Sequence, residues 1–175
     1  MQYVTKSLLL ALTVMIIASC GASYQQTREQ RSAEEAAEHA LVVKALEDAD
    51  FILDITQIIP NGFPSKTSTG EYQLRLEGDV VTTRLPFIGV SHEPVYAGVD
   101  EVSIVFEKEK VQLEKDFSKV SRKGEYVYKF TGGKGNDPWT VALHVFESGT
   151  ATIACTSAGG RFMNFFANLV IPEKR

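Results

Sequence analysis

Apolar and polar side chains alternate along most of the chain after residue 50, which predicts a protein built mainly of β-strands. The clearest case is EYVYKFT, in which Tyr126, Tyr128 and Phe130 would face a core while the intervening residues face water. Glycine, proline or charged residues separate each alternating segment from the next. The predicted strands cover residues 51–59, 71–77, 80–85, 102–106, 111–117, 125–131, 139–146, 150–156 and 163–171.

The predicted strands follow one another without the helices that a parallel sheet needs for its crossover connections. The predicted fold class is therefore mainly β: an antiparallel meander of about eight or nine strands with one N-terminal amphipathic helix. A sheet of this size has to close into a barrel or fold into a sandwich, because otherwise its edges stay exposed. The pattern leaves both arrangements open.

The helix is predicted over residues 32–50, SAEEAAEHALVVKALEDAD, where the apolar residues adopt the helical period. Ser32 and Glu35 have the spacing of a capping box at its start. One stripe of apolar side chains is expected to pack on the domain: Ala37, Leu41, Ala45 and Ala49.

The chain begins with a short segment that carries Lys6, followed by the uncharged apolar run SLLLALTVMII over residues 7–17. This run has the length of the apolar core of a secretory signal and is too short to cross a membrane as a helix, which takes about 20 residues. It ends at Cys20, after which the sequence turns polar.

The residues Ile17-Ala18-Ser19-Cys20 resemble the lipobox of bacterial lipoproteins, in which two small residues precede the acylated cysteine. The resemblance implies a signal peptide over residues 1–19 and a mature chain that starts at Cys20 with fatty acyl chains such as palmitate. A plain cleaved signal and an uncleaved anchor are the alternatives. Residues 20–31 would then be a polar tether and residues 32–175 a single β-rich domain. The implied location is the cell envelope, with the outer membrane favoured because Gly21, and not aspartate, follows the cysteine. That sorting rule does not hold in all bacteria, so the leaflet and the face, periplasmic or surface, stay open.

The charge balance argues against nucleic acid as a partner, because 18 basic and 22 acidic side chains give a net charge of -4. The two cysteines form no Cys-x-x-Cys pair and cannot build a disulfide scaffold. If Cys20 is acylated it cannot pair with Cys155, which lies among apolar residues of a predicted strand and is expected to be a small buried hydrophobe.

No motif of catalysis or metal binding stands out. The three histidines, His39, His92 and His144, are not at metal-ligand spacing, and His144 is expected at the surface of its strand. The glycine-rich run TGGKGNDP, residues 131–138, lacks the helix and the hydroxyl residue of a phosphate loop, so a hairpin loop is predicted there. The Gly-x-Ser-x-Gly motif is also absent. We therefore expect no catalytic residues, no metal site and no cofactor.

The segment from Leu85 to Gly98 is unusual, because large apolar residues occur there together with prolines and glycines that prevent a regular strand. Such residues either plug the end of a core or line a rim that contacts a ligand or partner. The residues predicted for such a rim are Phe87, Ile88, His92 and Tyr96.

The same segment carries a family resemblance. GDVVTTRLPFIG resembles the Leu-Pro-Tyr-Phe-Gly signature of an uncharacterised family of Gram-negative envelope lipoproteins, the domain of unknown function DUF4251. VSIVFE, GEYVYKF and VALHVFESGTATIACTS match later elements of that family in order, so the likeness spans residues 51–171. Val90, Ser91 and His92 stand where members often have arginine, alanine and tyrosine. The family has no assigned activity, so the resemblance implies fold and location only.

The functional expectation is a lipid-anchored envelope protein that works as a binding or interaction module. Its partners would be the membrane, through the lipid on Cys20, and an unidentified envelope protein or small ligand. The alternatives are a hydrolase acting on envelope glycans or lipids, and a structural spacer. The sequence leaves enzymatic activity undecided.

Overall fold

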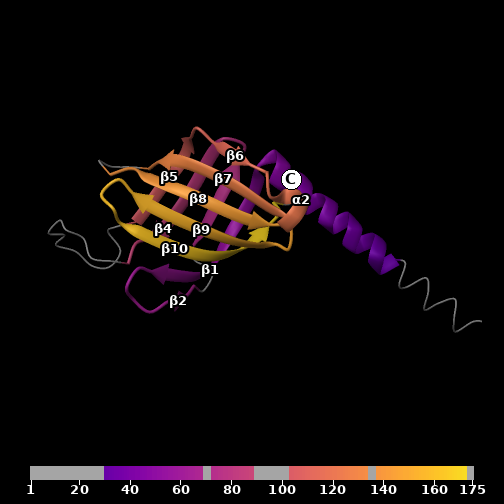
Figure 1. Ribbon diagram of the computed structural model, residues 1–175, viewed down its shortest axis with the longest axis horizontal. Helices are drawn as coiled ribbons and strands as arrows, with labels where there is room; N and C mark the ends of the chain where they lie inside the picture. The colour runs from indigo at the N-terminus through magenta and orange to yellow at the C-terminus, as the bar shows by residue number, and fades with distance from the viewer. Residues whose placement is uncertain (1–29, 69–71, 89–102, 134–136, 173–175) are drawn as a thin grey trace, which may run out of the picture. The chain divides into compact units, whose positions relative to one another are not determined.

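The β domain is one curled antiparallel sheet, as the computed structural model in Figure 1 shows. The structure describes residues 30–68, 72–88, 103–133 and 137–172. The sheet has ten strands and forms a half-barrel, so the predicted mainly β class is confirmed, and the described strands all belong to this one sheet. Among the described residues, no helix combines the length and the hydrophobicity needed to cross a bilayer.

The strands run β5-β4-β3-β1-β10-β9-β8-β7-β6 across the sheet, with β2 paired to β1. This order holds eight pairs of neighbouring strands, and seven of them join strands that follow one another along the chain when the short β2 is passed over, as a meander requires. The exception is the pairing of β1 with β10, which joins the two ends of the domain through eight residue pairs. The bounds are β1 (Asp50–Pro60), β2 (Lys66–Thr67), β3 (Gln73–Glu77), β4 (Val80–Pro86), β5 (Ser103–Lys110), β6 (Glu114–Asp116), β7 (Glu125–Gly132), β8 (Trp139–Phe146), β9 (Thr150–Ser157) and β10 (Phe162–Val170).

One predicted strand differs clearly from the observed element, and one short helix was not predicted. The strand expected over residues 111–117 is shortened to β6, and the short helix α2 (Val120–Lys123) follows it. Asp116 ends β6, because its side-chain oxygen accepts a hydrogen bond from the backbone N–H of Ser118 at 2.9 Å, as in an Asx turn. Gly124 then ends α2 in the left-handed conformation, with φ at 60°.

The N-terminal helix covers residues 30–48 and leads into β1. The predicted stripe is correct only in its second half: Ala45 and Ala49 are buried, whereas Leu41 is 59% exposed. From Leu41 onward the helix belongs to the β domain, where the Tyr128 hydroxyl donates a hydrogen bond to the Leu46 carbonyl oxygen. This contact fixes the last turn of the helix against the inner face of β7.

The concave face of the sheet is filled by aromatic side chains. The Phe51 and Tyr128 rings lie 5.4 Å apart, and the Phe106 and Phe130 rings lie 5.5 Å apart. Burial of one such ring stabilises the fold by about 1.5–3 kcal/mol before packing is counted. Cys155 is fully buried on the same face, and burial raises the pKa of its thiol to about 12. The expectation that it is a buried hydrophobe is therefore confirmed.

Candidate functional site

The predicted rim begins where β4 ends. Leu85 is fully buried, Phe87 is only 7% exposed, and Ile88 packs against the core while remaining partly exposed. The Phe87 ring therefore belongs to the core and plugs the end of the sheet. His92 and Tyr96 lie outside the described residues, so their part in a rim stays a prediction.

Phe87 and Trp139 both pack against the side chain of Arg161. The Phe87 and Trp139 rings lie 5.7 Å apart, centroid to centroid. The guanidinium carbon of Arg161 lies 5.4 Å from the Phe87 centroid and 5.0 Å from the Trp139 centroid. Both distances are in the range of a cation–π interaction, so the positive charge holds the two rings together at this end of the sheet.

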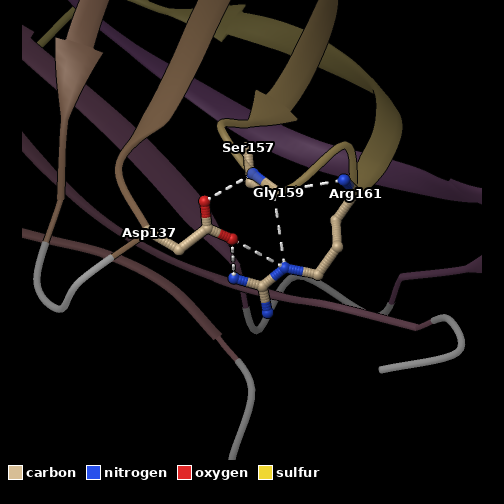
Figure 2. Close-up of polar contacts among 4 residues, drawn as sticks. All are labelled: Asp137, Ser157, Gly159 and Arg161. Atoms are coloured by element: carbon tan, nitrogen blue, oxygen red, sulfur yellow. Dashed lines mark hydrogen bonds and ion pairs between the residues drawn. The ribbon is translucent and has the colours of Figure 1, made fainter. Parts of the chain in front are cut away.

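A carboxylate completes the surroundings of this guanidinium, as Figure 2 shows. Arg161 donates to Asp137 Oδ2 from Nη2 at 2.6 Å and from Nε at 3.1 Å. The backbone N–H of Gly159 donates to the other oxygen, Asp137 Oδ1, at 2.7 Å. The Gly159 N–H and then the Arg161 guanidinium hold the pKa of the Asp137 carboxyl below its usual value. Ser157 Oγ accepts a further bond from the Arg161 backbone N–H at 3.1 Å.

We call Asp137, Ser157, Gly159 and Arg161 the Arg161 cluster. Asp137 lies just before β8, Ser157 ends β9, and Arg161 lies just before β10, so the cluster ties two adjacent loops together. Through Phe87 it also fixes the segment that leaves β4. The side chains of Arg161 and Asp137 are both partly exposed, so the cluster borders the solvent. Its ion pair and ring contacts hold Phe87 in place where β4 ends.

Sequence reasoning did not identify the Arg161 cluster. Asp137 and Arg161 lie in two different turns, and only the pairing of β8 with β9 brings those turns together. The sequence shows only that Asp137 precedes Pro138 and that Arg161 follows Gly159 and Gly160, which marks both as turn residues.

A histidine–carboxylate pair lies elsewhere on the domain. His144 Nδ1 lies 2.8 Å from Glu125 Oε1, and Lys119 Nζ lies 3.9 Å from Glu125 Oε2. The Glu125 side chain is 8% exposed and the His144 side chain is 36% exposed, so the histidine borders solvent as expected but its partner was not foreseen. The hydrogen bond with His144 is the main reason that the pKa of Glu125 lies below its usual value.

This pair can hold and orient a proton, but no hydroxyl or thiol among the described side chains hydrogen-bonds to His144. A nucleophilic dyad or triad needs such a contact. The described part of the chain likewise contains no group of three or more His, Cys, Asp or Glu side chains placed to hold a metal ion.

The fold and these sites define a small β domain in which an ion pair joins the residues before β8 and β10 at one end of a curled sheet. The family model "Domain of unknown function (DUF4251)" matches residues 33–165, and the chain therefore belongs to this family. The chain is also similar to the crystal structure, at 1.95 Å resolution, of a DUF4251 family protein from Bacteroides eggerthii DSM 20697. That likeness has a TM-score of 0.52 and 16% identity, covers 78% of this chain and 89% of the other, and concerns the fold alone. None of the curated proteins matches the chain.

Proposed function

We propose that this protein is a lipid-anchored component of a bacterial cell envelope and that its β domain is a binding module. The observation that carries the proposal is the apolar run of residues 7–17 followed by Ile17-Ala18-Ser19-Cys20. The thiol of Cys20 would receive a diacylglyceryl group, and cleavage before it would remove residues 1–19. Two or more acyl chains give a stable membrane anchor, whereas one gives only marginal binding.

The binding role is supported by the end of the sheet where β4 stops. Phe87 is held between the core, Trp139 and Arg161, so the chain that follows starts from a fixed point. Loops that carry binding residues are commonly supported in this way by a rigid scaffold. We assign the contact with a ligand or envelope partner to the segment that follows, with His92 and Tyr96 as its contact residues.

The anchor is tested by metabolic labelling of cells with an alkyne fatty acid, comparing the parent chain with Cys20→Ala. We expect label on the parent and none on the variant, and the variant should leave the detergent phase for the aqueous phase. An unlabelled parent, or a variant that partitions as the parent does, would contradict the anchor.

The rim is tested by photo-crosslinking from residues 92 and 96 in intact cells, with mass spectrometry of the captured species. A crosslinker at Phe63 is the matched control, because this exposed residue lies in the turn between β1 and β2. We expect one defined species from residues 92 and 96 that is absent from the control. The same species from all three positions, or none from residues 92 and 96, would refute the rim.

A second candidate, an envelope hydrolase, is supported by one observation, the His144–Glu125 pair. In such an enzyme His144 would act as the general base and the Glu125 carboxylate would orient it, so activity would depend on both side chains. Hydrolysis of envelope glycans or lipids that His144→Gln abolishes would favour this candidate. Hydrolysis that His144→Gln leaves unchanged would exclude this pair as its origin.

A further inference from the structure

The outer, convex face of β8, β9 and β10 is almost free of charge. The outward side chains of β9 are three threonines and an alanine, and His144 is the only ionisable residue among the outward positions of these three strands. This contrasts with the chain as a whole, in which 23% of the residues are charged.

Strand β10 places aromatic and amide side chains in alternation on this face. Its outward residues, in order, are Phe162, Asn164, Phe166, Asn168 and Val170. Phe166 is 45% exposed, and Phe162 and Val170 are also exposed large hydrophobic residues. Successive outward side chains on a strand are about 7 Å apart, so the Phe166 ring has an amide on either side of it along the strand, Asn164 and Asn168.

A surface depression of about 310 Å³ lies around Phe166. Its lining contains no charged side chain and combines two aromatic rings with three hydroxyls and one carboxamide. The lining residues are Thr56, Phe146, Thr150, Ala151, Thr152, Phe166, Ala167 and Asn168. The volume lies at the lower end of the range for sites that bind small molecules.

Two contacts show that part of this lining is ordered by the protein itself. The Thr56 hydroxyl donates to the Phe166 carbonyl oxygen at 3.2 Å, and the Thr150 hydroxyl lies 3.0 Å from Ser148 Oγ. A threonine hydroxyl has one donor and two acceptor positions, so each keeps capacity for a ligand. The Asn168 carboxamide makes no hydrogen bond with any other described side chain and keeps both its donor and its acceptor.

We propose that this depression binds a neutral carbohydrate. A sugar presents a face of C–H groups that can stack on the Phe166 ring, and hydroxyls at its edge that both donate and accept hydrogen bonds. The threonine hydroxyls and the Asn168 amide of the protein also both donate and accept hydrogen bonds. Each sugar hydroxyl can therefore find a donor or an acceptor in the lining. The absence of charge in the lining fits an uncharged ligand.

Other occupants fit this surface less well. A hydrophobic protein segment would bury the threonine hydroxyls and the amide without partners, which costs free energy for each group. A phosphate-rich or uronate ligand would find no cation in the lining to pair with. The site lies on the convex face, whereas Phe87 and Arg161 lie at the end of the sheet, so the inference depends neither on the proposed rim nor on the anchor.

The test uses the full chain, purified in a zwitterionic detergent that has no sugar headgroup. The chain is applied to an array of neutral gluco-, manno-, galacto- and xylo-oligosaccharides, with uronate oligomers alongside, and each ligand is then titrated calorimetrically. We expect at least one neutral oligosaccharide to bind with a Kd of about 1 mM or tighter. Cys20→Ala should bind it equally well, which separates this result from that of the anchor experiment.

Variants locate the site. Phe166→Ala should weaken binding about tenfold, the effect of losing one aromatic stacking contact, while Phe166→Trp should preserve it. Asn168→Ala should also weaken binding. Phe63→Ala is the matched control, because Phe63 is 47% exposed but lies outside the depression, and it should bind as the parent does.

Several results would overturn the inference: no binding of any neutral oligosaccharide, binding of the uronates alone, or binding that Phe166→Ala and Asn168→Ala both leave unchanged. Two further results would assign the face to another occupant. In both of them no sugar binds. In the first, the chain self-associates and Phe166→Ala abolishes the association; in the second, it binds phosphatidylcholine vesicles and Phe166→Ala abolishes that binding.

Discussion

Replacing Phe87 by alanine tests whether the start of the predicted rim belongs to the core. The ring is 7% exposed and contacts Trp139 and the Arg161 guanidinium. Truncation of a buried phenylalanine typically costs about 3–5 kcal/mol, made up of lost transfer free energy and a residual cavity. Because this ring lies at the end of the sheet, where the neighbouring chain can relax into the space, we expect the lower end, about 3 kcal/mol.

Equilibrium unfolding in urea, followed by the fluorescence of the single Trp139, measures this loss directly. The midpoint should fall while the slope is unchanged, and the thermal midpoint should fall by about 10 °C. Phe63→Ala, which removes an equally large but exposed ring, should change the free energy of unfolding by less than about 0.5 kcal/mol.

A double-mutant cycle between Phe87→Ala and Arg161→Met should show a coupling of about 0.5–1 kcal/mol, the size of a cation–π contact at a partly exposed site. A loss for Phe87→Ala no larger than that of Phe63→Ala would refute the reasoning. In that case the ring would be a surface residue and the plug at this end of the sheet would not exist.

Three further predictions concern buried ionisable groups. Because the folded-state pKa of Glu125 is lowered, its stabilising effect is present above the ordinary pKa and is lost as the pH falls through the folded value. The urea midpoint of the parent should therefore decline below about pH 5, and that of Glu125→Gln should decline less steeply. A decline as steep in the variant as in the parent would contradict this. Asp54→Asn should be neutral or stabilising by up to about 1 kcal/mol in urea unfolding, because Asp54 Oδ1 is buried without a partner among the described residues. In the Cys20→Ala chain, Cys155 should resist iodoacetamide at pH 8 until urea is added, and rapid labelling without urea would show that it is accessible.

The strands could be predicted from the sequence because each has one face in the core and one in water. β8 shows this most clearly, since Trp139, Val141, Leu143 and Val145 are all buried and their neighbours are more exposed. The end of β6 at residue 116 could not be foreseen from alternation, because it depends on the local turn at Asp116. Leu41 has helical spacing but little to pack against, so its apolar character misled the prediction.

The contacts of the candidate site could not be predicted, because they depend on register. Asp137 and Arg161 are 24 residues apart, and Glu125 and His144 are 19 apart. In each case the neighbouring strands must be paired at the observed positions before the side chains meet. A shift of one residue in the pairing of two strands would move every side chain of one strand to the opposite face of the sheet. Hydrophobic patterning therefore constrains the register of two strands, but only once it is known which strands are neighbours.

The central claim, that acylation of Cys20 tethers this β domain to a membrane, is tested most directly by the intact mass of the protein isolated from its native membrane. The predicted result is a chain that begins at Cys20 and carries a diacylglyceryl group on that residue. A chain that begins at any other residue, or one whose Cys20 is unmodified, would contradict it.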